Sequence, residues 1–251
     1  MKVLFVHDCA HVCQDLARHL NERGVETEFL PLTTFLDAVK KMRKSDADII
    51  HANYIHSPAH AAFLSGKRPY VLMAHGDDIR YGLSFSQRME ISRASLCFHS
   101  TPDLDGIIDG SILIPQPVDI ERFHPMGEKG NGKKAVYFTQ STSDPRLRAN
   151  EKEYITRISS YCLEKGYELT IVPSMTHIPY EQMPQFLSNF SLFFDKEFPA
   201  DAYSKTALEC MAMKIAVFDS DSVESNFDYV LRNHAAPVVA DKLIDCYESC
   251  L

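Results

Sequence analysis

The chain has 251 residues, 45% hydrophobic and 24% charged, with a formal net charge of −8 at pH 7. This composition is typical of a globular protein with a buried core, not of a disordered or fibrous chain. Binding to nucleic acid is not expected, because such binding depends on clustered Lys and Arg. The one short basic run, at 40–44, lies in a helical pattern and is interpreted as a solvated face.

The first residues, MKVLFVHDCA, contain an apolar run too short for a signal-peptide core or a membrane span. The seven cysteines are an odd number and are scattered along the chain, which indicates reduced thiols without a disulfide framework. We therefore expect a cytoplasmic protein, and we leave peripheral association with a membrane open.

The first half of the chain alternates short runs rich in Val, Ile, Leu and Phe with amphipathic stretches. Six runs are predicted as strands: 2–6, 26–30, 47–51, 70–75, 95–100 and 111–115. The stretches predicted as helices are 12–23, 35–43 and 86–93. This βαβα order predicts a parallel sheet with helices on both faces.

A segment rich in Pro, Gly and charge, 115–134, has no periodicity and is interpreted as a linker. After it the same pattern restarts. Strands are predicted at 134–140, 168–173, 191–195 and 215–219, and helices at 151–164, 180–188, 204–213 and 223–232. The sequence therefore predicts two Rossmann-like parallel-sheet domains facing a cleft, an N-terminal domain at 1–126 and a C-terminal domain at 127–251.

Ligands of doubly wound sheets bind at the carboxyl ends of the strands, so polar residues just after strands are the site candidates. In the first half these include His7, Asp8, Asn53 and His75. We expect His7, Asp8 and Asn53 on the acceptor side of the site.

The candidates in the second half centre on 197–213, EFPADAYSKTALECMAM, which follows a strand and opens a helix. Ser204, Lys205 and Thr206 offer backbone N–H groups, hydroxyls and an ammonium at the positive end of the helix, which suits a diphosphate. The alternative is an ordinary capped helix with an exposed lysine. Glu209, one turn along, supplies a carboxylate for ribose hydroxyls.

The run from Asp201, DAYSKTALECMAMKIAVF, resembles the acidic-x7-Glu donor motif of the retaining nucleotide-sugar glycosyltransferases of family 4, which have the GT-B architecture. MAHGDDIR at 73–80 is similar to the family's His-Gly-x-Asp-x-Arg segment, and ILIPQPVDIERFHP at 112–125 to its interdomain linker. The sequence departs from the family at Asp201, where Glu is usual, and at Lys214, where Gly is usual.

This resemblance implies a retaining, metal-independent glycosyltransferase of the hexosyltransferase type. It would use a UDP-, GDP- or ADP-sugar as co-substrate, with no further cofactor. By the same resemblance Glu209 binds the donor ribose, 204–206 hold phosphate, and His75 and Asp201 are catalytic beside the transferred sugar. Protein cations would neutralise the diphosphate in place of a metal.

The family places an Arg and a Lys after the first strand of the second domain. Arg146, Arg148 and Lys152 lie there in an ambiguous register, and a solvated charged loop and helix start is the alternative. The family also has a Gly-Gly loop after its first strand, whereas this chain has HDCAHVCQD at 7–15. Its alternating His and Cys residues cannot all converge on one ion, so no metal site is predicted.

Two further expectations concern the remaining histidines and the end of the chain. Most remaining histidines are expected on the surface or in loops: 19, 56, 60, 99, 124, 177 and 234. The chain ends soon after the amphipathic stretch 242–251, so we expect it to lack the family's terminal helices that cross back onto the first domain.

Two alternatives to a glycosyltransferase stay open at this point. One is a noncatalytic partner subunit that binds a nucleotide sugar or a glycan, and the other is a nucleotide-sugar epimerase. The acceptor, whether a glycan, a small molecule or a lipid-linked compound, is not encoded by any motif, and association with a partner subunit or a second copy is left open.

Overall fold

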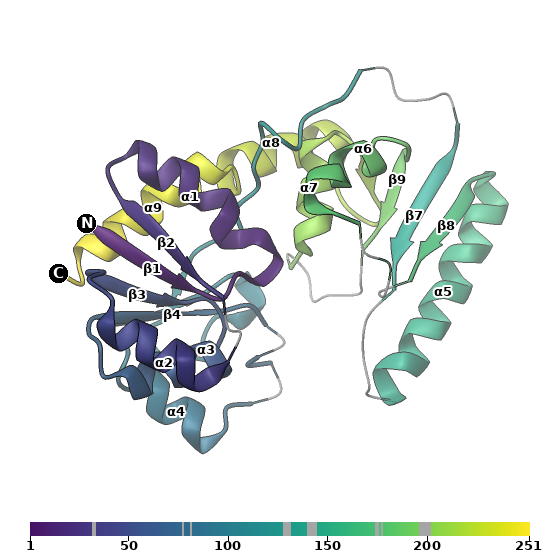
Figure 1. The fold of residues 1–251 in the computed structure, drawn as a ribbon. Coiled ribbons are helices and arrows are strands. Elements are labelled where there is room, and N and C mark those ends of the chain that lie inside the picture. The colour runs from purple at the N-terminus through teal and green to yellow at the C-terminus, as the bar shows by residue number, and fades with distance from the viewer. Residues whose placement is uncertain are drawn as a thin grey trace. The chain divides into compact units, whose positions relative to one another are not determined.

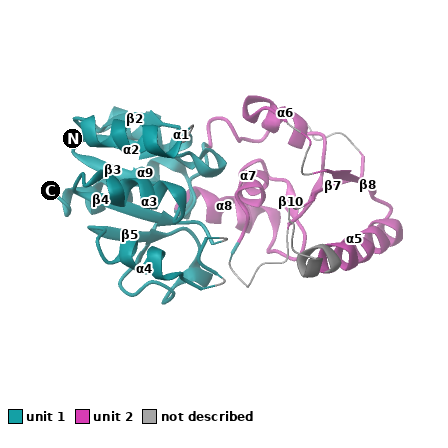
Figure 2. Ribbon diagram, turned by 60° about the horizontal axis from the view of Figure 1, so that its bottom comes forward, with its two compact units in different colours: residues 1–119, 199–202, 233–251 teal, residues 120–198, 203–232 magenta. Residues whose placement is uncertain are grey.

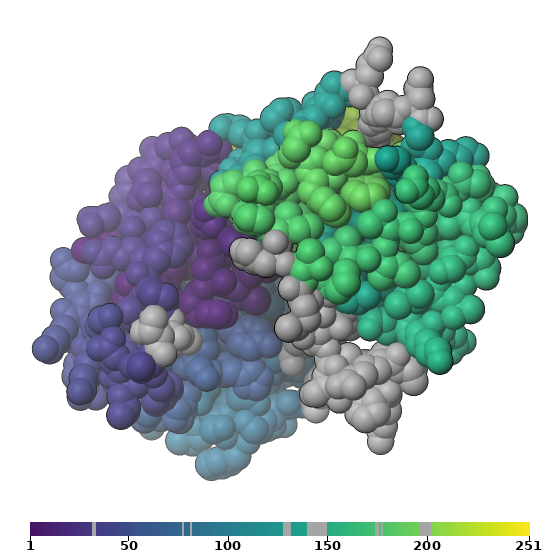
Figure 3. Space-filling view, turned by 45° about the vertical axis from the view of Figure 1, so that its right-hand side comes forward, coloured from purple at the N-terminus to yellow at the C-terminus, as the bar shows by residue number. Residues whose placement is uncertain are grey.

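The fold was analysed in a computed structural model (Figure 1). It describes these residues: 1–31, 34–76, 78–80, 82–127, 132–139, 145–173, 176, 178–195 and 202–251, without the side chains of 145–149. The remaining residues are grey in the ribbon and in the space-filling view (Figure 3). Within the described part, no helix is long and apolar enough to cross a membrane.

The chain forms two compact α/β units (Figure 2). Unit 1 contains residues 1–119, Ala202 and residues 233–251, whereas unit 2 contains the described residues of 120–195 and 203–232. Each unit has its own parallel sheet.

The sheet of unit 1 consists of the six strands that the sequence predicts. Their bounds are β1 Lys2–Val6, β2 Glu26–Leu30, β3 Ile49–Ala52, β4 Tyr70–Ala74, β5 Leu96–His99 and β6 Ile112–Leu113. Their order is β2-β1-β3-β4-β5-β6, and every neighbouring pair is parallel. In the register of the central strands, Phe5 lies opposite His51.

Helices cover both faces of this sheet, because successive side chains of a strand point to opposite faces. Leu4 and Val6 pack in one cluster with α2 (Phe35–Lys44) and α3 (Ser57–Ser65). Val3 and Phe5 pack in another with α1 (Val12–Glu22) and α9 (Ala236–Glu248). A further helix, α4 (Phe85–Ile91), lies beside α3.

The return of α9 to unit 1 contradicts the expectation that the chain lacks such a helix. Leu243 and Tyr247 of α9 are fully buried against the sheet. A parallel bridge joins Ala235, just before the helix, to Val118. The apolar face of α9 is visible in the sequence, but its packing partner is not.

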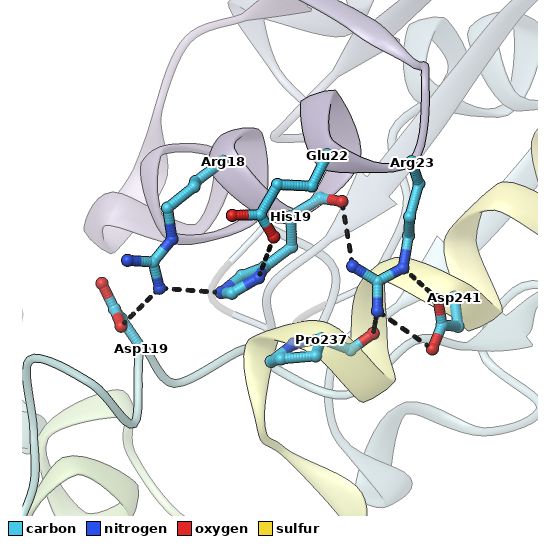
Figure 4. A network of polar contacts seen from close by, with 7 residues as sticks. All are labelled: Arg18, His19, Glu22, Arg23, Asp119, Pro237 and Asp241. Atoms are coloured by element: carbon cyan, nitrogen blue, oxygen red, sulfur yellow. Dashed lines mark hydrogen bonds and ion pairs between the residues drawn. The ribbon is translucent and has the colours of Figure 1, made fainter.

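A polar network reinforces this attachment (Figure 4). The Arg23 guanidinium donates to the Asp241 carboxylate of α9 and to the carbonyl oxygens of Pro237 and His19. Arg18, one turn earlier on α1, donates to Asp119 at 3.4 Å. Asp119 is the last residue of unit 1 before the chain enters unit 2, and Asp241 lies in the helix that returns to unit 1. Side chains of α1 and its C-cap therefore hold both of these segments.

Helix α3 was not predicted, although 57–65 forms two and a half turns of helix. Its buried residues are mostly small and lie on several sides of the helix: Pro58, Ala59, Ala61, Ala62 and Ser65. A helix buried on several sides carries no polar stripe, so the periodicity that reveals amphipathic helices is missing.

Unit 2 repeats the pattern with four strands, all of them predicted. Its strands are β7 Lys134–Phe138, β8 Glu168–Val172, β9 Leu192–Phe194 and β10 Ala216–Val217, in the order β10-β9-β7-β8. Its helices are α5 Pro145–Lys165, α6 Met183–Leu187, α7 Lys205–Ala212 and α8 Val223–Asn233. Tyr137 and Phe194 of the sheet pack against Tyr154 and Ile158 of α5.

Both sheets share one topology. When the strands of each unit are numbered in chain order, each sheet contains the sequence 2-1-3-4. The order reverses between β1 and β3 in unit 1 and between β7 and β9 in unit 2. Doubly wound sheets bind ligands at the carboxyl ends of the strands at this reversal, so each unit has one position where a site is expected.

Candidate functional site

At the carboxyl edge of the unit 1 sheet, Asn53 follows β3 and His75 follows β4. Asn53 is fully buried, and its Oδ1 lies 2.7 Å from Nε2 of His75. Because an amide oxygen only accepts hydrogen bonds, Nε2 is the donor, and Nδ1 of the neutral imidazole is then an acceptor. The structure therefore brings together two of the predicted residues.

Asp78 holds the loops that carry these two residues. Its Oδ1 accepts from the backbone N–H groups of His75 (3.0 Å) and Gly76 (2.9 Å), and its Oδ2 from that of Ile55 (2.9 Å). Asp78 is buried, and carboxylates that accept several backbone N–H groups form strong hydrogen bonds. Asp78 lies within the segment that carries the family resemblance, but the sequence does not show that it joins two loops.

Gly76, next to His75, is required because the Arg80 side chain approaches its backbone closely. Gly76 has a φ of 112°, and a Cβ at this position would lie 2.2 Å from Nη1 of Arg80. Nε of Arg80 donates to Asp103 Oδ2 at 2.7 Å. The segment after β4 is thus anchored by its own Asp and Arg, which leaves the His75 side chain half-buried at the edge.

The loop after β1 adopts tight geometry without glycine. His7, Ala10 and His11 have φ values of 66°, 53° and 60°, all in the left-handed region. Asp8 accepts from the backbone N–H groups of Cys13 (2.8 Å) and Gln14 (3.1 Å) and so caps the start of α1. Burial raises the pKa of Asp8.

No group of three or more His, Cys, Asp or Glu side chains in the described residues is arranged to hold a metal ion. The expectation for the other histidines is wrong in part. His19 is buried in α1 and His99 is buried in β5, and each is hydrogen-bonded. His234 lies in the turn between α8 and α9, as expected for a loop residue.

Tyr54 lies among three imidazoles at this edge. Its ring centroid is 6.4 Å from that of His7, 5.3 Å from that of His56 and 6.4 Å from that of His75, with the His75 ring stacked. The adjoining pocket has a volume of about 370 Å³ and is lined by His7, Phe35, Tyr54, His56, Ser57 and Pro58.

In unit 2, the predicted helix start is confirmed, and Ser204 is its N-cap. Its Oγ accepts from the N–H of Ala207 at 3.2 Å, while its own N–H donates to Asp195 Oδ2 at 2.9 Å. Asp195 directly follows β9, so this bond fixes the start of α7 to the end of the strand at the topological reversal. The capping role that the sequence left as an alternative is therefore present.

Lys205 and Glu209 lie on the first turns of α7 and are both buried. Lys205 Nζ is 3.6 Å from Glu209 Oε1, which also accepts from the Tyr180 hydroxyl at 3.0 Å. The Arg122 guanidinium lies over the Tyr180 ring at 4.7 Å and Lys205 Nζ lies 5.9 Å from the same ring. Lys205 is thus not the exposed lysine of the alternative, and Arg122 and Tyr180 are members of the cluster that sequence reasoning missed.

The other predicted residues of the donor side differ in exposure, and some lie outside the described residues. Thr206 is half-buried on the first turn of α7, and Lys152 is exposed on α5. Asp201 and His177 lie outside the described residues, as do the side chains of Arg146 and Arg148.

No protein-family model matches the chain, and no curated protein sequence is significantly similar to it. Solved structures share its fold. HepE of Anabaena in complex with UDP-glucose is 11% identical, with a TM-score of 0.61 over 99% of this chain and 100% of that one.

Two further structures are 10% identical over 99% of this chain. One, from Listeria monocytogenes, is assigned as a UDP-N-acetylglucosamine 2-epimerase and is covered over 96% of its length with a TM-score of 0.58. The other is the UDP-GlcNAc 2-epimerase of Methanocaldococcus jannaschii, covered over 92% with a TM-score of 0.51. The predicted α/β fold class, with two Rossmann-like parallel-sheet units of the GT-B type, is confirmed.

Proposed function

We propose that this chain is a retaining glycosyltransferase that takes a hexose from a UDP-sugar bound by unit 2. The observation that carries the proposal is the buried cluster of Lys205, Glu209 and Tyr180 on and beside α7, where the strand order reverses. UDP is favoured over GDP or ADP because HepE, which shares the fold, was solved with UDP-glucose.

The chemistry of the cluster suits a nucleoside diphosphate. In the proposed complex Glu209 accepts hydrogen bonds from ribose hydroxyls. Lys205 and the first-turn N–H groups of α7 stabilise the negative charge that develops on the departing diphosphate. Asp201 would contact sugar hydroxyls, and Arg146, Arg148 and Lys152 would add positive charge around the phosphates.

In the proposed reaction an acceptor hydroxyl oxygen bonds to the anomeric carbon on the face from which the phosphate oxygen leaves. The hydroxyl proton passes to that phosphate oxygen, so no other base is needed. His75, with Nε2 held by Asn53, would present a neutral imidazole to the transferred sugar. A neutral acceptor of this kind stabilises positive character on the sugar without adding a competing charge.

Calorimetric binding of UDP-glucose, with GDP- and ADP-glucose as comparisons, tests the donor site. We expect Glu209→Gln to weaken UDP-glucose binding at least about tenfold, because hydrogen bonds to a charged group are lost. Glu153→Gln, an exposed change in the same unit, is the matched control. Unchanged affinity of Glu209→Gln, with an unaltered unfolding temperature, would exclude this residue from the donor site.

A nucleotide-sugar epimerase is the second candidate, because two of the similar structures carry that assignment. Incubating the purified chain with UDP-GlcNAc and no acceptor distinguishes the two by NMR of the sugar. Conversion to the 2-epimer would favour the epimerase. Donor binding without hydrolysis, epimerisation or transfer would instead assign a noncatalytic binding subunit.

A further inference from the structure

The described residues that line the pocket of about 370 Å³ beside Tyr54 all belong to unit 1, and none of them is a member of the donor cluster. The pocket's volume is at the small end of the range typical of small-molecule sites, roughly 300–1,000 Å³. It adjoins the β1/β3 reversal, where His7 and Tyr54 follow the two strands. The position and size fit one small molecule or one terminal group of a larger one.

The polar side of the pocket is made of hydrogen-bond donors. His7 and His56 each carry a ring N–H in either protonation state, and Ser57 carries a hydroxyl. Among the described residues that line the pocket, none is acidic. A ligand that brings negative charge or several acceptor oxygens therefore finds hydrogen-bond donors and, among the described lining residues, no opposing carboxylate.

The start of α3 adds to this donor surface. Ser57 is the first residue of α3, and its N-cap His56 makes no side-chain capping hydrogen bond. The partial positive charge of the α3 N-terminus thus lies at the pocket wall.

The pocket also has apolar lining residues. Phe35, Tyr54 and Pro58 contribute two aromatic rings and a pyrrolidine ring to its wall. Aromatic faces bury ring-shaped ligands with a large contact area. The pocket therefore combines a surface for a ring with donors for an anionic group.

We infer that this pocket binds a small hydroxylated ring that carries an anionic group, either a carboxylate or a phosphate. This role of the pocket rests on the proposed function, under which the ligand is the sugar acceptor or the terminal residue of that acceptor. The ring packs on Tyr54 and Phe35, and the anionic group contacts His56 and the start of α3.

A charge series on one ring tests the inference by calorimetry with the full chain. The probes are D-glucuronate, D-glucose and D-glucosamine, and glucose 6-phosphate distinguishes a phosphate from a carboxylate. We expect glucuronate or glucose 6-phosphate to bind at least roughly tenfold more tightly than glucose. Glucosamine should bind weakest. Equal affinities across the series, or no binding of either anion, would overturn the inference.

Two variants locate the interaction. His56→Ala should remove the preference for the anionic probes, and Tyr54→Ala should weaken the anionic probes and glucose alike. His124→Ala, an exposed histidine of unit 2, is the matched control and should change neither. Full anion preference in His56→Ala would overturn the assignment of the anion to this pocket.

UDP-glucose binding in the same variants separates the two proposals. If UDP-glucose binds but no anionic probe does, the pocket inference fails and the donor site stands. If an anionic probe binds in a His56-dependent way but UDP-glucose does not, the pocket stands and the proposed function fails.

Discussion

The His51 imidazole and the Tyr247 hydroxyl lie 2.5 Å apart in the buried interior of unit 1, Nδ1 to Oη. The two residues are 196 positions apart and join β3 to α9. Burial lowers the pKa of His51 to about 3, with a smaller contribution from His75. The pair therefore couples the attachment of the last helix to the protonation of a core histidine.

This coupling predicts acid sensitivity. Between pH 6.5 and about 3 the unfolded chain protonates His51 while the folded chain does not. The free energy of unfolding should therefore fall as the pH is lowered through this window, by up to about 1.4 kcal/mol per pH unit from His51 alone. Above pH 6.5 the contribution is constant. Urea unfolding at a series of pH values measures it.

The control for this slope is the double variant His51→Phe with Tyr247→Phe, which leaves neither polar partner buried alone. Its unfolding free energy should depend less on pH than that of the unmodified protein, whereas His124→Ala should leave the slope unchanged. His99, whose pKa burial also lowers, is present in all three proteins, so their difference isolates His51. Identical slopes in all three would refute the prediction.

The packing of α9 predicts a large difference between two substitutions on one helix. Leu243 is fully buried against the unit 1 sheet, whereas Val238 is 43% exposed. Leu243→Ala should lower the free energy of unfolding by about 2–5 kcal/mol because it leaves a cavity. Val238→Ala should lower it by less than about 1 kcal/mol. Comparable losses in thermal unfolding would mean that α9 does not pack as described.

The three backbone bonds of Asp78 predict that Asn cannot replace it. An Asn amide has one acceptor oxygen, so Asp78→Asn would set its NH₂ group against at least one buried N–H donor. We expect a loss of about 2–4 kcal/mol and a changed NMR shift for the His75 ring. Asp109→Asn, at an exposed position, should show neither effect. A stable variant with an unaltered His75 resonance would exclude a positioning role for Asp78.

The Tyr180 hydroxyl provides a milder test of the donor cluster than removal of Glu209. Tyr180→Phe deletes the bond to Glu209 Oε1 but keeps the ring that contacts Arg122 and Lys205. If the cluster binds the donor, UDP-glucose affinity should fall about fivefold. Tyr161→Phe is the control, because Tyr161 lies on α5 of the same unit and its ring contacts Phe194 and Phe218, outside the cluster of Glu209. An effect of equal size in both would point to a general change in unit 2.

The sequence by itself determined the ten strands, their parallel arrangement and the start of α7. These features depend on local properties: apolar runs of strand length, alternation with amphipathic stretches, and a serine whose hydroxyl can cap a helix. Their repetition in two halves predicted two Rossmann-like units, and the resemblance of the motifs implied the GT-B type of fold. The same local patterns predicted that His7, Asn53, His75 and Glu209 lie near the carboxyl ends of strands.

Only the tertiary structure decided which of these residues meet. The pairs His51–Tyr247 and Tyr180–Glu209 join segments far apart in the sequence, so no local period connects them. Helix α3 was not predicted, because a helix buried on several sides has no polar stripe. The order of strands in a sheet, which periodicity does not encode, brings the loops of His7 and Tyr54 to one pocket.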